Sequence, residues 1–444
     1  MRLFALLTVL PLALAAPVCS VNNMAASTTA TTTPTPATTA AAPTPTTNTT
    51  SPGGGSSSRI AMGWYADWHS NFTVSNINWS GYNTMTYFTA QPDSNLNVEL
   101  LDGSTLDQFV STAHTNNVKA LLTIGGWDGS IYWSSSVATA QNRSTFATNV
   151  AQFASAHNLD GIDFDWEYPG KQGVGCNVIS SNDTANFLEF ITELRQQAPN
   201  LTLSAAVSVL PFVDSTGSPS TNVSGFAQQL DWIEIMNYDV FGSFSTVTGP
   251  NAPLDDSCSS NPSGSAKSAV AAWTQAGFPA DQIVLGVPSY SHSFSVPSST
   301  AAPNGQIQLY TSFSAANEPQ GDAWDYIPPG TLDVCGNSQG PNGVFNFWAL
   351  VGYGYLNSDG SVASGMLSTF DNCSQTPFLY DPNSQVLFSY DNPQSFSTVP
   401  LFLGRRVRSH FRVAAKGQYI SQAGLRGFAM YEVGGDYNGL LINA

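Results

Sequence analysis

From residue 59 onward, short runs of apolar residues alternate with longer stretches in which apolar side chains recur every three or four positions. The short runs are rich in β-branched and aromatic residues and predict strands, whereas the amphipathic stretches predict helices. Residues 144–157 and 184–197 are the clearest predicted helices. Eight strands are predicted, at residues 60–65, 84–88, 120–124, 161–167, 202–208, 232–237, 283–288 and 427–431.

Eight strands alternating with helices favour an α/β fold of the (β/α)8 TIM barrel type. A doubly wound open sheet is the alternative, but such sheets usually have fewer strands, and no glycine-rich phosphate loop is present. The interval between the last two predicted strands is too long for one crossover. We therefore expect a small α+β insertion domain at residues 295–390, between strands seven and eight, where it would wall one side of a cleft at the carboxyl-terminal face.

The first 58 residues lack this alternation. Residues 1–16 join one arginine to an apolar run and an Ala-Leu-Ala cleavage site, which predicts a signal peptide. Residues 17–58 are rich in Thr, Ala, Pro and Ser and predict a low-complexity linker. The predicted catalytic part is then 59–444. We expect a secreted, extracellular or cell-wall-associated protein, and eight N-glycosylation sequons fit that setting.

The charge balance narrows the possible partners. Lys and Arg number 13 and Asp and Glu 30, for a net charge of −17. Neutralising phosphates requires clustered Lys and Arg, so nucleic acids and membrane surfaces are excluded as partners. A hydrophobic fraction of 42% with only 10% charged residues indicates a large folded core rather than disorder.

Five cysteines occur, of which Cys19 lies beside the predicted cleavage site. The other four, Cys176, Cys258, Cys335 and Cys373, suit two disulfides in any of three pairings. Their spacings match no zinc pattern, so we predict no metal site.

The most informative stretch is the octad Asp-Gly-Ile-Asp-Phe-Asp-Trp-Glu at 160–167. On a strand, Asp163, Asp165 and Glu167 point to one face, which in a barrel is the interior, and Glu167 lies at its carboxyl-terminal mouth. Like charges at this range raise one another's pKa, so at least one carboxyl stays protonated near neutrality, as a general acid requires. Asp160 has the opposite parity, which leaves it a structural role. An acidic calcium site or a solvated edge is the alternative, but calcium prefers flexible loops, and Ile162, Phe164 and Trp166 indicate a buried strand.

This octad closely resembles the catalytic signature of family 18 glycoside hydrolases, the chitinases. Three further segments resemble family motifs in the right order: 123–127, which contains Gly125 and Gly126, then 236–239, and then 283–290. The resemblance covers about residues 60–444 and is that of a class V type chitinase with an insertion domain.

The resemblance implies substrate-assisted, retaining hydrolysis of β-1,4-linked N-acetylglucosamine, without metal or cofactor. Glu167 would be the general acid and then the base, and the nucleophile would be the substrate's own acetamido carbonyl. Asp165 would hold the acetamido N–H, Asp163 would share a proton with Asp165, and Tyr238 would hydrogen-bond the acetamido group. The implied partner is chitin or a chitooligosaccharide, and we expect a monomer.

The resemblance also implies a sugar-binding cleft, although each of its aromatic residues, taken singly, could equally belong to the barrel core, and Met236 most of all. Two positions depart from the usual family pattern, Tyr431 in place of Trp and His292 where Arg often stands. The predicted substrate-binding residues are Trp64, Phe88, Trp127, Tyr168, Met236, Asp239, Tyr290 and Tyr431.

Residues 397–413 have no counterpart in the family pattern and hold four of the nine arginines. A basic surface loop is one interpretation. Our preferred hypothesis is a retained intron or mispredicted exon.

Two other functions compete with a chitinase. An endo-β-N-acetylglucosaminidase acting on N-glycans can share the acidic motif, but the predicted insertion would deepen a cleft for an extended polymer and favours the chitinase. A chitinase-like lectin typically lacks the terminal glutamate, and Glu167 is present.

Overall fold

The computed structural model describes residues 59–101, 103–259, 262–396 and 415–444. The predicted signal peptide, the linker with Cys19 and the segment 397–413 lie outside the described residues. Within the described ranges, no helix is long and apolar enough to cross a membrane.

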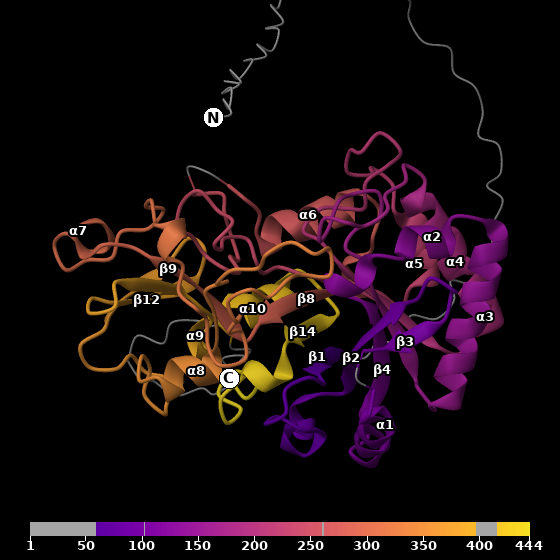
Figure 1. The fold of residues 1–444 in the computed structure, drawn as a ribbon, viewed down its shortest axis with the longest axis horizontal. Helices are drawn as coiled ribbons and strands as arrows, with labels where there is room; N and C mark the ends of the chain where they lie inside the picture. The colour runs from indigo at the N-terminus through magenta and orange to yellow at the C-terminus, as the bar shows by residue number, and fades with distance from the viewer. Residues whose placement is uncertain (1–58, 102, 260–261, 397–414) are drawn as a thin grey trace, which may run out of the picture. The chain divides into compact units, whose positions relative to one another are not determined.

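Eight parallel strands form a closed barrel, in which β1 pairs with both β2 and β14 (Figure 1). This confirms the predicted TIM barrel. A short strand, β3 (Val98–Leu100), adds to the end of β2 in antiparallel orientation. The barrel strands in spatial order are β1 (Ile60–Ala66), β2 (Thr84–Pro92), β4 (Lys119–Gly125), β5 (Gly161–Asp165), β6 (Thr202–Val207), β7 (Trp232–Ile235), β8 (Ile283–Pro288) and β14 (Gly427–Tyr431).

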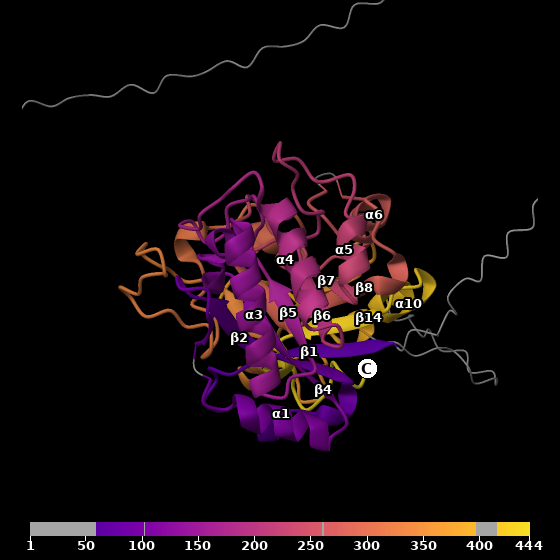
Figure 2. The ribbon, with the colours of Figure 1, turned by 90° about the vertical axis from the view of Figure 1, so that its right-hand side faces the viewer.

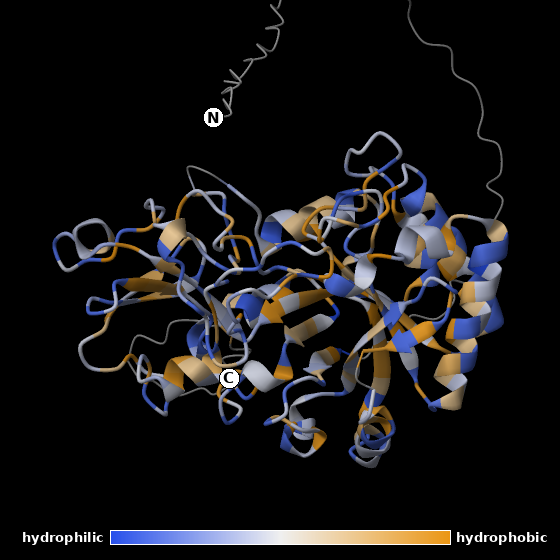
Figure 3. Ribbon diagram, in the orientation of Figure 1, coloured by the Kyte–Doolittle hydropathy of each residue, from blue (hydrophilic) through white to orange (hydrophobic). Residues whose placement is uncertain are grey.

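Helices cover the outside of the barrel, so the strands are buried on both faces and read as nearly continuous apolar runs. Figure 3 shows hydrophobic residues concentrated along the strands, with hydrophilic residues on the helices and loops around them. Figure 2 shows the two longest helices, α3 and α4, side by side on the outer face. The barrel helices are α1 (Leu106–Thr115), α2 (Trp133–Val137), α3 (Ala140–Ala156), α4 (Asp183–Gln197), α5 (Ser224–Gln229), α6 (Ala266–Gln275) and α10 (Ala415–Gln422).

Several predicted boundaries differ from the structure, among them the start of α3 and the end of β5. Helix α3 begins four residues before the predicted start because the side chain of Thr139 accepts a hydrogen bond from the backbone N–H of Asn142 at 3.1 Å and caps the first turn. Strand β5 ends at Asp165, since its pairing with β6 ends at Phe164, so Glu167 lies just beyond the strand rather than in it.

The long interval between β8 and β14 contains a second, antiparallel five-stranded sheet, seen beside the barrel in Figure 1. Only Ser289 separates β8 from the first strand of this sheet. Its strands in spatial order are β10 (Val344–Asn346), β9 (Tyr290–Ser295), β13 (Val386–Ser389), β12 (Thr376–Asp381) and β11 (Leu367–Asp371), and the helices of the interval are α7 (Ser298–Ala301), α8 (Phe347–Gly352) and α9 (Pro393–Phe396).

Two disulfides tie the insertion to the barrel. Cys176 in the β5–α4 loop bonds to Cys335, and Cys258 in the β7–α6 loop bonds to Cys373 between β11 and β12. This is one of the three pairings that the sequence allows.

Candidate active site

A cleft opens at the carboxyl-terminal ends of the barrel strands. One cavity of about 790 Å³ is lined by Asp165, Glu167 and Tyr168. A neighbouring cavity of about 580 Å³ extends toward the insertion and shares Trp127, Glu167 and Tyr168 with the first. The cleft therefore runs to both sides of Glu167, as a site for an extended ligand requires.

Asp163 lies inside the barrel beneath the cleft and is fully buried. Its Oδ2 accepts hydrogen bonds from Trp64 Nε1 at 3.0 Å and Thr123 Oγ1 at 2.8 Å, and its Oδ1 accepts one from Ser204 Oγ at 2.8 Å. Burial raises the pKa of Asp163, and these three donors oppose the rise because they stabilise the carboxylate. The side chain is held in one orientation by three strands.

Glu234 on β7 is a further buried acid beneath the cleft, and it was not predicted from the sequence. Trp232 Nε1 donates to its carboxylate. Burial, together with the charge of Asp163, raises the pKa of Glu234 well above its ordinary value. The parity of β7, with Trp232, Glu234 and Met236 on one face, could have revealed it.

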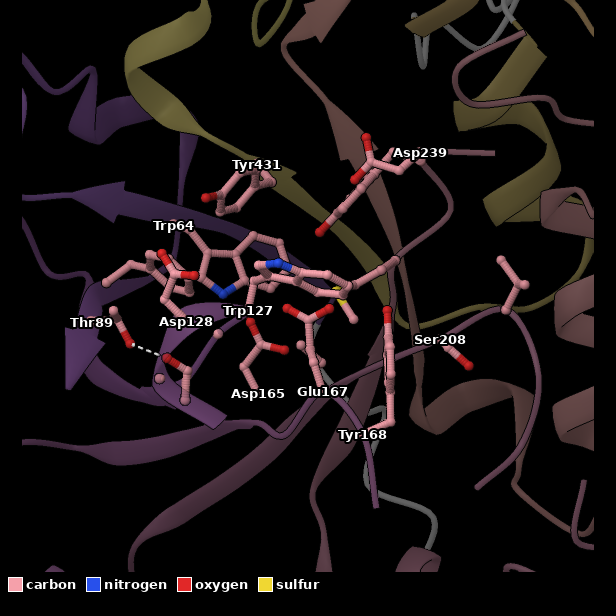
Figure 4. Close-up of a pocket in the computed structure, with 18 of the residues that line it drawn as sticks. Trp64, Thr89, Trp127, Asp128, Asp165, Glu167, Tyr168, Ser208, Asp239 and Tyr431 are labelled. Atoms are coloured by element: carbon pink, nitrogen blue, oxygen red, sulfur yellow. Dashed lines mark hydrogen bonds between the residues drawn. The ribbon is translucent and has the colours of Figure 1, made fainter. Parts of the chain in front are cut away.

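Asp165 and Glu167 point into the cleft from the end of β5, toward Tyr431 (Figure 4). Burial raises the pKa of Glu167 to about 7; a hydrogen bond with Tyr168 opposes the rise, and the charges of Asp239 and Asp128 add to it. Burial and the charges of Glu167 and Asp163 raise the pKa of Asp165 well above its ordinary value. Asp165 Oδ1 is buried without a hydrogen-bond partner among the described residues, which leaves it an acceptor for a ligand.

The backbone beyond β5 is held by side chains from neighbouring loops. The N–H of Glu167 donates to Ser130 Oγ at 2.9 Å, and its carbonyl accepts from Asn177 Nδ2 at 3.3 Å. Gly173 approaches the same carbonyl so closely that a Cβ there would lie 2.0 Å from it. The loop that contains Cys176 therefore supports the position of Glu167.

Gly125 and Gly126 form the turn at the end of β4. Their φ angles are 124° and 88°, which only glycine adopts readily. A Cβ on Gly125 would lie 2.0 Å from the carbonyl oxygen of Asp165, and the N–H of Gly126 donates to that oxygen at 2.7 Å. The two glycines let β4 and β5 meet directly under the cleft.

Asp239 follows β7 in the left-handed region, with a φ of 55°, and its N–H donates to Asn251 Oδ1 at 2.8 Å. Its Oδ1 accepts from Tyr290 Oη at 2.8 Å and lies 2.7 Å from His292 Nε2. His292 therefore contacts the site through Asp239, where the family pattern often has an arginine.

Tyr238 and Tyr431 face each other across the cleft floor, with ring centroids 6.0 Å apart and planes at 26°. Tyr431 also meets Trp64 and Phe88 edge-on, at 6.0 and 5.5 Å. Burial raises the pKa of both tyrosines well above the ordinary value, so both keep their hydroxyl protons.

The predicted substrate-binding aromatics divide into two groups. Trp127 is 50% exposed, as a platform for a ligand must be, whereas Trp64 and Phe88 are 1% and 7% exposed and support the floor. Met236 packs against the barrel interior and also lines the cleft. Trp68, which was not among the predicted residues, is 47% exposed and lines both cavities.

Asp160 lies at the opposite end of β5 from the cleft. Its Oδ2 accepts from the N–H of Ala120 and lies 2.8 Å from His114 Nε2. It anchors β5 to β4 and α1 and takes no part in the cleft. Among the described residues, no group of His, Cys, Asp or Glu is arranged to hold a metal ion.

Comparison with known proteins places this site in a family. The profile of the glycosyl hydrolases family 18 matches residues 60–436. A chitinase-like effector of Moniliophthora roreri is 42% identical over 393 residues, which cover 87% of this chain and 91% of that protein. Chitinase A1 of Niallia circulans is 28% identical over 353 residues, 76% of this chain and 44% of that protein. The crystal structure of a chitinase from Rhizomucor miehei has a TM-score of 0.75 at 28% identity, covering 87% of this chain and 98% of that one.

Proposed function

Because the chain belongs to family 18 of the glycosyl hydrolases, we propose that it is an active chitinase, which hydrolyses β-1,4-linked N-acetylglucosamine and retains the anomeric configuration. The observation that carries the proposal is the row of acids that ends in the cleft. Asp163 is fixed below the floor, Asp165 presents an unpartnered acceptor, and Glu167 has a pKa of about 7.

In the proposed mechanism, Glu167 protonates the glycosidic oxygen. A pKa near 7 keeps its proton in place below neutrality and still lets it act as a base once the proton is transferred. The substrate's acetamido oxygen attacks the anomeric carbon, the bond to the leaving sugar breaks, and an oxazolinium ion forms. Asp165 accepts the acetamido N–H, and Glu167 then takes a proton from the water that opens the ring.

Tyr238 and Tyr431 have separate tasks. Tyr238, protonated and beside the acids, donates its hydroxyl to the acetamido group. Tyr431 supplies the floor against which the reacting sugar packs, with the smaller ring where the family usually has tryptophan. Trp127 and Trp68 are exposed rings that line both cavities, where further sugars of the polymer would pack.

We further propose that the protein acts outside the cell that makes it. The apolar run of residues 1–16 and the sequons of the chain support export. The absence of clustered Lys and Arg in the motif regions agrees with a neutral polysaccharide as the partner.

A second candidate is a chitin-binding protein with little turnover. The 42% identical relative is named a chitinase-like effector rather than a chitinase, and Tyr431 departs from the usual floor residue. Such a protein would bind the same ligand in the same cleft.

One assay separates the candidates. Wild type and Glu167→Gln are incubated with chitin oligosaccharides and with an N-glycosylated protein, and released sugars are measured. We expect wild type to cleave the oligosaccharides and the variant to lose at least about three orders of magnitude in rate. Equal release by both proteins would refute the role of Glu167. Release by neither, with both binding chitin, favours the second candidate, and release only from the glycoprotein favours the endo-β-N-acetylglucosaminidase.

A further inference from the structure

A second groove lies outside the catalytic cleft, between the β1–β2 connection, the segment after β14 and the insertion. Its volume is about 510 Å³, and we call it the flank groove. Flat aromatic rings and side-chain amides line it together, a combination that suits a pyranose ring with an acetamido group. Its rings are Phe72, Tyr82, Trp324, Trp348 and Tyr437, and its amides are Asn71, Asn76, Asn78 and Asn438.

Two of these amides belong to N-glycosylation sequons. Asn71 heads Asn-Phe-Thr and Asn78 heads Asn-Trp-Ser, and both side chains are exposed. Among the described residues, no other sequon asparagine lines this groove. An N-linked glycan begins with N-acetylglucosamine, so the attachment points and a surface suited to the attached sugar lie together.

At Asn71, the atom that carries an N-linked glycan is Nδ2, whereas the contact with Trp324 is made by Oδ1. Trp324 Nε1 donates to Asn71 Oδ1 at 2.7 Å, which fixes the plane of the amide. Glycosylation takes place at Nδ2 and leaves Oδ1 as an acceptor, so this bond survives the modification. Trp324 is itself held, because it stacks on His69 with centroids 3.8 Å apart and meets Trp348 edge-on at 5.0 Å.

We propose that Asn71 carries an N-linked glycan whose first N-acetylglucosamine residues lie in the flank groove against Trp324 and Trp348. In the transfer, Asn71 Nδ2 bonds to C1 of the first sugar of a lipid-linked oligosaccharide diphosphate. The C1–oxygen bond to the diphosphate breaks, Nδ2 gives up one proton, and the lipid diphosphate leaves. The inference rests on the export proposed above, because only exported chains meet that donor.

The seated glycan affects the catalytic cleft through a shared wall. Trp324 lines both the flank groove and the smaller cleft cavity. A sugar packed against the outer face of Trp324 holds this wall in place without entering the cleft.

The test measures how fast a glycosidase that cuts the Asn–sugar linkage removes the glycan. The full chain is secreted from a eukaryotic host, and glycopeptides covering Asn71, Asn78 and Asn200 are quantified by mass spectrometry. Asn200 is the matched control, because it is an exposed sequon in the turn between α4 and β6. We expect Asn71 to be modified and its glycan to be released about tenfold more slowly than that of Asn200 from the native protein. The difference should vanish after unfolding.

Three results would overturn the proposal: an unmodified Asn71, a glycan on Asn78 alone, or equal native release from Asn71 and Asn200. Trp324→Ala provides a second test when the variant is folded by circular dichroism, since removing the ring should bring release at Asn71 to the rate at Asn200. If that variant does not fold, the comparison in the wild-type protein decides alone. None of these readouts depends on whether the cleft is catalytically active.

Discussion

The proton on Glu167 should make the active site a source of instability at high pH. Glu167 has a pKa raised from 4.5 to about 7, chiefly by burial. In the unfolded chain the carboxyl ionises near pH 4.5, whereas the folded protein resists ionisation until pH 7. The contribution of this carboxyl to the free energy of unfolding is therefore fully present below pH 4.5 and is lost as pH rises through 7.

The size of the effect follows from the two pKa values. The rise in pKa from 4.5 to about 7 corresponds to a loss of about 3 kcal/mol in the free energy of unfolding by pH 8, at about 1.4 kcal/mol per tenfold change in proton affinity. Part of the side chain faces the cleft, where water screens it, so we expect about 1–3 kcal/mol. Glu167→Gln removes this pH-dependent loss of stability, because glutamine does not ionise. The variant should equal wild type in stability at pH 4 and exceed it at pH 8, although its activity is lost.

Chemical denaturation followed by tryptophan fluorescence at pH 4 and pH 8 measures this difference. Glu189→Gln is the matched control, because Glu189 is an exposed glutamate on α4, 3.8 Å from Arg143. The control should change stability by less than about 0.5 kcal/mol at either pH. A stability difference for Glu167→Gln that is the same at both pH values would show that burial does not raise the pKa of this group.

Three further outcomes test the architecture of the site. Gly125→Ala should abolish activity and destabilise the fold by more than about 3 kcal/mol in urea, since its Cβ would lie 2.0 Å from a carbonyl oxygen of β5, whereas Gly217→Ala, with φ 82° and open space, should cost only about 1 kcal/mol. Replacing the Cys176–Cys335 bond by serines should lower kcat on oligosaccharides at least about threefold, because that loop supports Glu167, while replacing Cys258–Cys373 should lower only thermal stability. Tyr431→Trp should tighten oligosaccharide binding by about 2–10-fold in calorimetry, and unchanged affinity would show that this ring is not a sugar platform.

The sequence predicted the barrel because most of its strands are short apolar runs separated by amphipathic stretches that form helices. It predicted the inward row of acids because parity along one strand is a local property. The family profile confirms the resemblance drawn from the octad and its companion motifs. The roles of Asp163, Asp165 and Glu167 remain predictions, which the structure makes specific.

The features that could not be predicted from the sequence depend on contacts between residues far apart in the chain. Strand β9 begins at Tyr290, before the expected start of the insertion, because it pairs with β10 and β13, which follow far along the chain. The disulfide pairing required knowledge of which loops meet above the barrel. Glu234 was missed because it lies between apolar neighbours on another strand, and only the closed barrel brings it to Asp163.

The attachment of the insertion has a mechanical consequence. Its sheet continues from β8 after a single residue and is bonded covalently to two barrel loops, β5–α4 and β7–α6. These attachments restrain the insertion from moving as a separate body relative to the barrel. For the proposed chitinase, the cleft would therefore have a nearly fixed width, and domain motion in this protein would not supply the work of detaching a sugar chain from an ordered fibre.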